Sequence, residues 1–173
     1  MIHIVLYQPE KPANTGNILR TAVALSAKVH LIGPLTFKVD DHSLKRAGMD
    51  YLTTADYEYY ENLDAFNEKH PHVNGYYITR YTNKSYVNAD FSQPGGEFYL
   101  FFGSESKGLP HQLLRDNFAR SYRIPMVPNA RSLNLSNAVA IVSYEVARQQ
   151  DFMGLAKAEA IKGRDFLKNE SID

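Results

Sequence analysis

The stretch MIHIVLYQPEKPANTGNILRTAVALSAKVHLIG, residues 1–33, decides the fold class. It opens with a short apolar run of strand length, Ile2–Tyr7, which ends before two prolines. Asn14 can cap the helix that follows, which is predicted to run to about Ala27 with apolar residues on its inner side. Val29–Ile32 then has the length and composition of a second strand. A strand, a helix and a strand in this order form the unit from which parallel sheets are built.

The rest of the chain continues this alternation of strands and helices. Further strands are predicted at Tyr76–Tyr81, at Phe98–Phe102 and in a short segment that Arg123–Pro125 closes after Tyr122. Further helices are predicted at Ser43–Ala47, Leu63–His70 and Leu135–Gln149. The last is the clearest, because its apolar residues recur at intervals of three and four. The pattern therefore predicts an α/β fold with a mostly parallel sheet and helices on both faces.

Length and composition narrow the class of protein. The 173 residues are enough for one domain or slightly more, and 44% of them are apolar. The chain contains no cysteine, which excludes disulfides, thiolate nucleophiles and thiolate metal sites. It also lacks the pattern of a signal peptide and any apolar run of about 18 residues, so we expect a cytoplasmic protein without a membrane span.

The charge is balanced overall but unevenly distributed. A formal net charge of zero argues weakly against a nucleic-acid binder. However, residues 51–75 carry five acidic side chains and only one basic one. We interpret this segment as a solvated acidic helix. If it folds away from the functional site, a basic face can remain elsewhere on the molecule.

Several common chemistries lack their sequence signature. No G-x-G-x-x-G or G-x-S-x-G motif is present. Gly103 and Gly108 have the spacing of a phosphate-binding loop, but Leu-Pro follows them in place of the lysine and hydroxyl residue that bind phosphate and magnesium. His70 and His72 flank a proline and are interpreted as part of a surface turn, so no metal is predicted.

Three unusual loops each follow a predicted strand, at residues 8–17, 103–110 and 125–134. Ligands of parallel α/β sheets bind beyond the carboxyl ends of the strands. We therefore predict that these three loops form one site. The motifs they carry are PANTGNILRT from Pro12, FFGSESKGLP from Phe101 and IPMVPNARSLNLSNA from Ile124.

Together, in order and spacing, the three motifs resemble the signature motifs of the SPOUT RNA methyltransferases. The resemblance runs from Met1 to about Asp151, and within that superfamily it is similar to the small tRNA (cytidine/uridine) 2′-O-methyltransferases that act on the wobble nucleotide. It implies a C-terminal trefoil knot, S-adenosylmethionine as the methyl donor and tRNA as the substrate. It also implies a homodimer through the helix Leu135–Gln149, in which Tyr144, otherwise read as a core residue, contacts the partner. Residues 152–173 are expected to form a last helix or a tail.

The resemblance also implies which residues bind the donor. Backbone groups of Gly103 and Ile124 would hydrogen-bond it, with Ser132 beside them and Ile78 as an apolar wall. Three of these residues also have a simpler interpretation that the sequence leaves open. Gly103 can be a turn glycine, Ile78 a core residue and Ser132 a helix cap.

Arg20, Asn14, Glu105 and Asn134 fall at the positions of catalytic residues in the family. Without the motifs, Arg20 would be read as an exposed helix arginine, Glu105 as a solvated side chain, and both asparagines as helix caps. A guanidinium has a pKa above ~12 and does not act as a base in proteins. We therefore expect Arg20 to grip an RNA phosphate and orient the ribose hydroxyl, while a phosphate or water accepts the proton.

Two other classes of function stay open. One is a catalytically silent RNA-binding module on the same fold, and the other is an unrelated α/β enzyme that acts on a small nucleotide. Within the methyltransferases, ribosomal RNA or another tRNA position is the main alternative substrate. The presence of Arg20, Glu105 and Asn134 favours the enzyme over the silent module.

Overall fold

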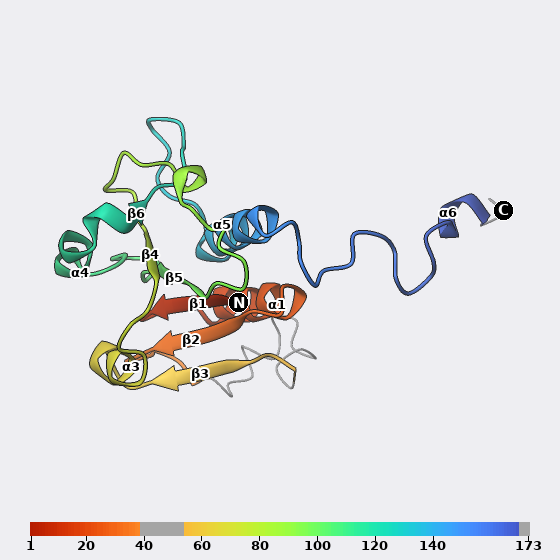
Figure 1. Ribbon diagram of the computed structural model, residues 1–173. Helices are drawn as coiled ribbons and strands as arrows, with labels where there is room; N and C mark the ends of the chain where they lie inside the picture. Colours follow the sequence, from red (N-terminus) through yellow and green to blue (C-terminus); the bar gives the residue numbers. More distant parts are fainter. Residues whose placement is uncertain (39–53, 170–173) are drawn as a thin grey trace.

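The computed structural model of the chain describes residues 1–38 and 54–169 (Figure 1). The helix predicted at Ser43–Ala47 lies outside the described residues. Within them, six strands form one sheet in which every pair of neighbours is parallel. The strands are β1 (Ile2–Tyr7), β2 (Lys28–Ile32), β3 (Tyr57–Tyr60), β4 (Gly75–Ile78), β5 (Phe98–Phe102) and β6 (Ser121–Tyr122).

The order of the strands places a topological switch in the middle of the sheet. Across the sheet the strands run β3-β2-β1-β5-β4-β6. On one side of β1 lie β2 and β3, which follow it directly in the sequence. On the other side lie β5, β4 and β6, which come later. The loops that leave β1 and β5 start from neighbouring strands at this switch. In parallel α/β sheets such a point is where ligands bind.

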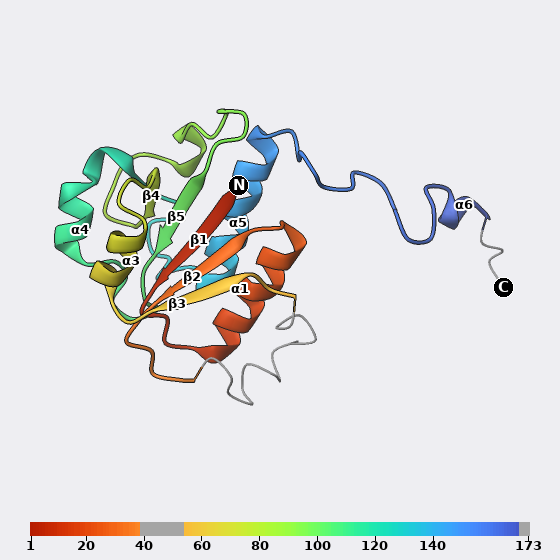
Figure 2. The same ribbon diagram turned by 60° about the horizontal axis from the view of Figure 1, so that its bottom comes forward.

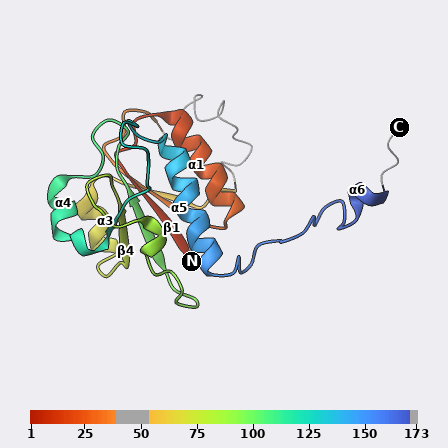
Figure 3. The same cartoon turned by 90° about the horizontal axis from the view of Figure 1, so that it is seen from above.

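Helices cover both faces of the sheet, as the sequence predicts. On one face, α1 (Pro12–Ala24) and α5 (Leu135–Gln149) lie side by side (Figure 3). On the other face lie α3 (Leu63–Lys69) and α4 (His111–Asp116) (Figure 2). Two short 3-10 turns, η2 (Tyr86–Asn88) and η3 (Phe118–Arg120), connect elements at the β6 side.

Two apolar cores lie on opposite faces of the sheet. Ile4 and Leu6 of β1 pack into the core beneath α1 and α5, whereas Val5 packs into the core with Phe66 of α3 and Leu114 of α4. All three β1 side chains are fully buried. A central strand covered on both faces is apolar at consecutive positions, and this explains the unbroken run that opens the sequence.

Helix α1 starts and ends earlier than predicted. Pro12 occupies its first turn, where the missing proline N–H costs no hydrogen bond. Asn14 therefore lies inside the helix and does not cap it, so the predicted capping role was wrong. At the other end the helix stops at Ala24, because Ser26 has a φ of 50° and turns the chain away.

Other predicted boundaries also differ from the structure. The segment interpreted as an acidic helix contains Tyr57–Tyr60, which forms the edge strand β3, consistent with the strand preference of aromatic residues. The strand predicted to reach Tyr81 ends at Ile78, and β6 ends at Tyr122, before the predicted closing residues. Helix α4 was not predicted, because its six residues are too few to show a period.

The C-terminal part of the chain leaves the packed body after α5. Phe152 and Leu155 still pack against the core beneath α1 and α5. Most residues after them are exposed, and the segment ends in the short helix α6 (Phe166–Asn169), far from the sheet (Figure 1). Among the described residues, no helix has the length and apolar character needed to cross a membrane.

Candidate active site

A pocket of about 560 Å³ opens at the carboxyl ends of β1, β4, β5 and β6. All three loops that the sequence singled out contribute to it, so the prediction of one shared site is confirmed. This volume lies within the range of pockets that bind small molecules and cofactors. The lining residues are Lys11, Asn14, Ile78–Tyr81, Phe102–Leu109, Arg123, Ile124, Met126, Arg131–Leu135 and Ala138.

Seven of the eight predicted site residues line this pocket, namely Asn14, Ile78, Gly103, Glu105, Ile124, Ser132 and Asn134. Their roles stay predictions, but the structure brings them together from segments more than 100 residues apart. Arg20 is the exception. It is exposed on α1 and is not among the residues that line the pocket.

Glu105 joins the loop after β5 to the start of α1. Its carboxylate accepts hydrogen bonds from the backbone N–H groups of Glu10 at 2.7 Å and Lys11 at 3.1 Å, and from Nδ2 of Asn14 at 2.8 Å. A carboxylate at a helix N-terminus also interacts favourably with the helix dipole. Glu105 is thus held in place by three donors.

A second hydrogen bond extends this network to the third loop. Nδ2 of Asn134 donates to Oδ1 of Asn14 at 2.9 Å. Oδ1 of Asn134 caps α5 by accepting from the backbone N–H groups of Ser136 at 2.9 Å and Asn137 at 3.4 Å. Each amide thus has one assigned orientation, with its NH₂ group as donor and its oxygen as acceptor. The hydrogen bonds run from Asn134 to Asn14 and from Asn14 to Glu105. They lock the three loops together.

The loop after β5 folds back on itself at Gly103. A Cβ at this position would overlap with the backbone atoms of Gly108 and Leu109. Gly108 has a φ of 72°, and its N–H donates to the carbonyl of Ser104 at 2.9 Å. The two glycines therefore allow a turn that no other residue at position 103 permits, and the turn forms one wall of the pocket.

The pocket concentrates positive charge, although the chain as a whole is neutral. Its described lining includes five basic side chains, Lys11, Arg80, Lys107, Arg123 and Arg131. Glu105 is the one acidic residue of that lining, and its oxygens already accept three hydrogen bonds. The acidic side chains Glu58 and Asp64 lie at the opposite edge of the sheet or beyond it, on β3 and α3. A basic face thus remains at the site, and it suits an anionic ligand.

The lining residues Thr79, Arg80 and Tyr81 were missed by the sequence reasoning. The predicted strand Tyr76–Tyr81 placed them inside the sheet, whereas they belong to the loop after β4. A signal was present, because Thr79-Arg80-Tyr81-Thr82-Asn83-Lys84 is polar and basic and breaks the apolar character of the strand.

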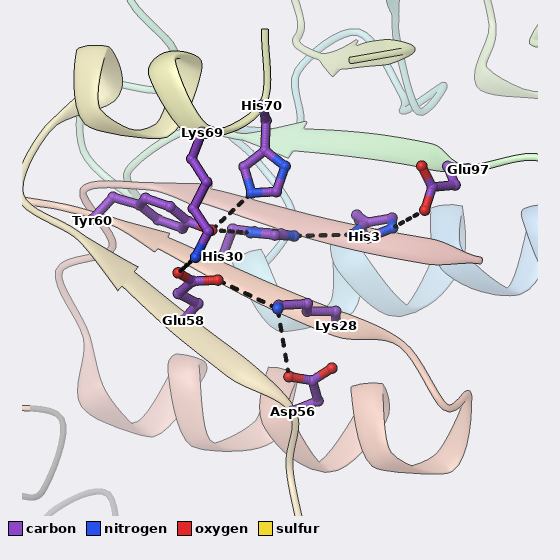
Figure 4. A network of polar contacts seen from close by, with 9 residues as sticks. All are labelled: His3, Lys28, His30, Asp56, Glu58, Tyr60, Lys69, His70 and Glu97. Atoms are coloured by element: carbon purple, nitrogen blue, oxygen red, sulfur yellow. Dashed lines mark hydrogen bonds and ion pairs between the residues drawn. The ribbon is translucent and has the colours of Figure 1, made fainter. Parts of the chain in front are cut away.

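A second polar cluster lies in the core beneath α3, away from the pocket (Figure 4). Nδ1 of His3 is 3.0 Å from Nε2 of His30, and Nδ1 of His30 is 3.0 Å from the hydroxyl of Tyr60. The same hydroxyl is 2.9 Å from Nε2 of His70. His70 therefore turns inward and is not part of a surface turn with His72, which corrects the interpretation of that pair.

The cluster is close enough to hold a metal ion, since ligand atoms of His30, Glu58 and His70 lie within 4.8 Å of one another. The contacts of these residues favour a different role. The Tyr60 hydroxyl bridges the two imidazoles, and Glu58 pairs with Lys28 at 3.3 Å and with Lys69 (Figure 4). Hydrogen bonds and ion pairs thus satisfy the group. We interpret it as a structural network of the core.

We expect this network to make folding sensitive to acid. Burial, together with the neighbouring His3 and His70, lowers the pKa of His30 to about 3, and burial also lowers the pKa values of His3 and His70. Between pH 6.5 and 3 the unfolded chain binds protons that the folded chain excludes, so stability is complete above pH 6.5 and falls as the pH decreases. His30 alone should cost about 1.4 kcal/mol per pH unit in this window.

Urea unfolding of the protein at pH 7.5, 6.5, 5.8 and 5.0 measures this loss. His30→Gln removes one of the three titrating groups and should make the dependence shallower, while the exposed His72→Gln serves as a control and should keep the wild-type slope. An unchanged slope in His30→Gln would show that the network does not set the acid sensitivity.

Comparison with known proteins identifies relatives along most of the chain. Residues 1–144 match the model of the SpoU rRNA Methylase family. A Geobacillus stearothermophilus protein, provisionally named a tRNA (cytidine(34)-2′-O)-methyltransferase, is 49% identical over 155 residues, which cover 90% of this chain and 99% of that protein. A solved structure described as giving insights into the 2-OH methylation of C/U34 on tRNA is 41% identical, with a TM-score of 0.78, and the match covers 88% of this chain and 97% of that one.

A more distant solved structure was determined with the donor present. The AdoMet-bound rRNA methyltransferase of Sinorhizobium meliloti is 27% identical to this chain, with a TM-score of 0.75. The match covers 85% of this chain and 56% of that one. The shared part is therefore nearly the whole of the described domain.

Proposed function

Because the chain belongs to the SpoU rRNA Methylase family, we propose that it is a 2′-O-ribose methyltransferase that acts on the wobble nucleotide of tRNA. S-adenosylmethionine is the methyl donor, and cytidine or uridine 34 is the target. The observation that carries the proposal is the basic pocket at the topological switch, which all three motif loops line. The names of the 41–49% identical relatives support nucleotide 34 over ribosomal RNA.

The pocket residues fit the donor. The missing side chain at Gly103 leaves the loop backbone close to the cavity, where its polar groups can hydrogen-bond an adenine. Ile78 and Ile124 supply apolar surface for the ring, and Ser132 lies on the same lining. When bound, S-adenosylmethionine supplies the methyl group, which passes from its sulfur to the ribose 2′ oxygen as the hydroxyl proton leaves.

The chain contributes positioning more than chemistry to this reaction. The Glu105–Asn14–Asn134 network holds the three loops at fixed separations, so that a bound donor and a ribose meet in line. The basic residues of the pocket bind the RNA backbone. Arg20, outside the pocket lining, grips an RNA phosphate and orients the 2′-hydroxyl, and a phosphate or water accepts the proton. No metal is needed in this scheme.

We further propose that the protein is a cytoplasmic homodimer that associates through α5. Tyr144 supports this, because it is 46% exposed on the outer face of a helix whose inner face packs into the core. A trefoil knot in the C-terminal half of residues 1–151 is also part of the proposal, with residues 152–173 as a separate tail. The return of the chain from the edge strand β6 to α5, which contacts β1 and β5 at the centre, supports it. Sedimentation as a monomer at micromolar concentration would contradict the dimer.

Methyl transfer from labelled donor tests the proposed function directly. Wild-type protein should methylate bulk tRNA, and nuclease mapping should place the methyl group on nucleotide 34. A tRNA with a 2′-deoxyribose at position 34 is the matched control and should accept none. Transfer to ribosomal RNA alone would favour the alternative substrate, and donor binding without transfer to any RNA would favour a silent module.

Glu105→Gln should weaken donor binding about 10- to 100-fold. The substituted amide can accept fewer of the three hydrogen bonds, and its NH₂ would face N–H donors of Glu10, Lys11 or Asn14. Calorimetry with the demethylated product, S-adenosylhomocysteine, measures the change. Glu68→Gln, the same substitution at an exposed position on α3, is the control and should bind as wild type does. If both variants bind S-adenosylhomocysteine with equal affinity, Glu105 does not shape the pocket.

A further inference from the structure

The loop after β4 places an exposed tyrosine at the pocket. Tyr81 lines the pocket, and yet 54% of its surface is exposed. The tyrosines Tyr76 and Tyr77 of β4, just before this loop, are buried. The Tyr81 ring is therefore available to contact a ligand that enters the pocket.

The backbone on both sides of Tyr81 is fixed by hydrogen bonds. The N–H of Tyr81 donates to Oγ1 of Thr79 at 3.2 Å, and the N–H of Thr79 donates to the carbonyl of Tyr122 at 2.9 Å. Nη1 of Arg123 donates to the carbonyl of Arg80 at 3.4 Å. The loop is thus attached to the chain segment that continues β6, and the ring projects from a rigid support.

The surroundings of the ring are those of a nucleic-acid contact. His111 at the start of α4 meets the ring at 84° with a centroid distance of 5.3 Å, so the two rings pack edge to face. The guanidinium carbon of Arg80 lies 5.2 Å from the centroid of Tyr81. Arg123 and Lys107 line the same pocket. Exposed aromatic rings interleaved with cations bind single-stranded RNA, in which bases stack on the rings and phosphates pair with the cations.

We propose that Tyr81 is a stacking platform for an RNA base adjoining the methylated nucleotide. The ribose that reacts must enter the pocket, so the ring beside it meets the next base along the strand. The identity of the RNA rests on the proposed function, but the stacking itself does not depend on methyl transfer. Stacking on an aromatic face tolerates any base, so Tyr81 contributes affinity and positioning without reading the sequence.

Fluorescence of 2-aminopurine tests the proposal. Two anticodon stem-loops carry the probe, one on the 5′ side and one on the 3′ side of nucleotide 34. Wild-type protein should quench at least one of them on binding, because stacking quenches this base. Tyr81→Phe should keep the quenching, whereas Tyr81→Leu and Tyr81→Ala should lose it and weaken RNA binding about 10-fold. Donor affinity should change less than twofold in all three variants.

Tyr57→Ala, which removes an exposed tyrosine from the far edge strand β3, is the matched control and should behave as wild type. Quenching by Tyr81→Leu equal to that of wild type would overturn the proposal, and so would the absence of quenching in both stem-loops. Loss of donor affinity together with RNA affinity would also overturn it, because Tyr81 would then only shape the pocket. If wild type quenches in a Tyr81-dependent way but transfers no methyl group, the stacking stands and the proposed function fails.

Discussion

Gly103→Ala is expected to reduce donor affinity more than 100-fold. The added Cβ would overlap with the backbone of Gly108 and Leu109, and backbone atoms cannot rotate away as a side chain can. The loop would have to open, which separates Ser104 from Gly108 and displaces the wall of the pocket. Added atoms in a well-packed place cost about 1–3 kcal/mol or more, so unfolding should also become easier.

Calorimetry with S-adenosylhomocysteine and urea unfolding measure the two consequences separately. Gly95→Ala is the control for a methyl group added without a collision, because nothing lies near the position of its Cβ. Unlike Gly103, Gly95 has a left-handed φ of 68°, so this substitution should itself cost about 1–2 kcal/mol of stability. Donor affinity of Gly95→Ala should equal that of wild type. Normal donor binding by Gly103→Ala would show that the tight turn is not part of the donor site.

The parts of the site that the sequence predicts are those with a local signal. The apolar run Ile2–Tyr7 and the periodic helix Leu135–Gln149 both match the structure at their boundaries. The loops after β1 and β5 could be assigned to one site, because the carboxyl ends of parallel strands meet at one edge of the sheet. Asn134 was named as a cap of the helix that follows it, and the structure confirms this role.

The parts that could not be predicted depend on contacts between distant segments. Asn14 was named both as a cap and as an active-site amide; the start of α1 at Pro12 excludes the cap, and its hydrogen bonds to Glu105 and Asn134, 91 and 120 residues away, could not be read from the sequence. Tyr81 was placed in a strand although the polar segment after Ile78 signals the end of that strand, and only the exact residue where pairing with β6 stops is a tertiary property. The inward turn of His70 likewise depends on its hydrogen bond to Tyr60.

Arg20 lies on α1 beyond the residues that line the pocket. It lies six residues after Asn14 on α1, about 9 Å further along the helix axis at 1.5 Å per residue. It is exposed, and it is not among the residues that line the pocket. From this position a guanidinium can meet RNA that enters the pocket without touching a donor inside it. This arrangement is compatible with the predicted division of roles between Arg20 and the pocket residues, which methyl transfer by variants can test.

Arg20→Lys should therefore reduce methyl transfer to tRNA by at least 100-fold while donor affinity stays within twofold of wild type. Lysine keeps the charge but loses the planar fork that grips a phosphate with two hydrogen bonds. Arg20→Ala should reduce transfer to a similar extent and also weaken RNA binding, because the charge is lost as well. Arg115→Lys, an exposed arginine of α4 on the other face of the sheet, is the control. If Arg20→Lys and Arg115→Lys both transfer methyl groups at the wild-type rate, Arg20 is an ordinary surface residue and the hydroxyl must be oriented by one of the cations inside the pocket.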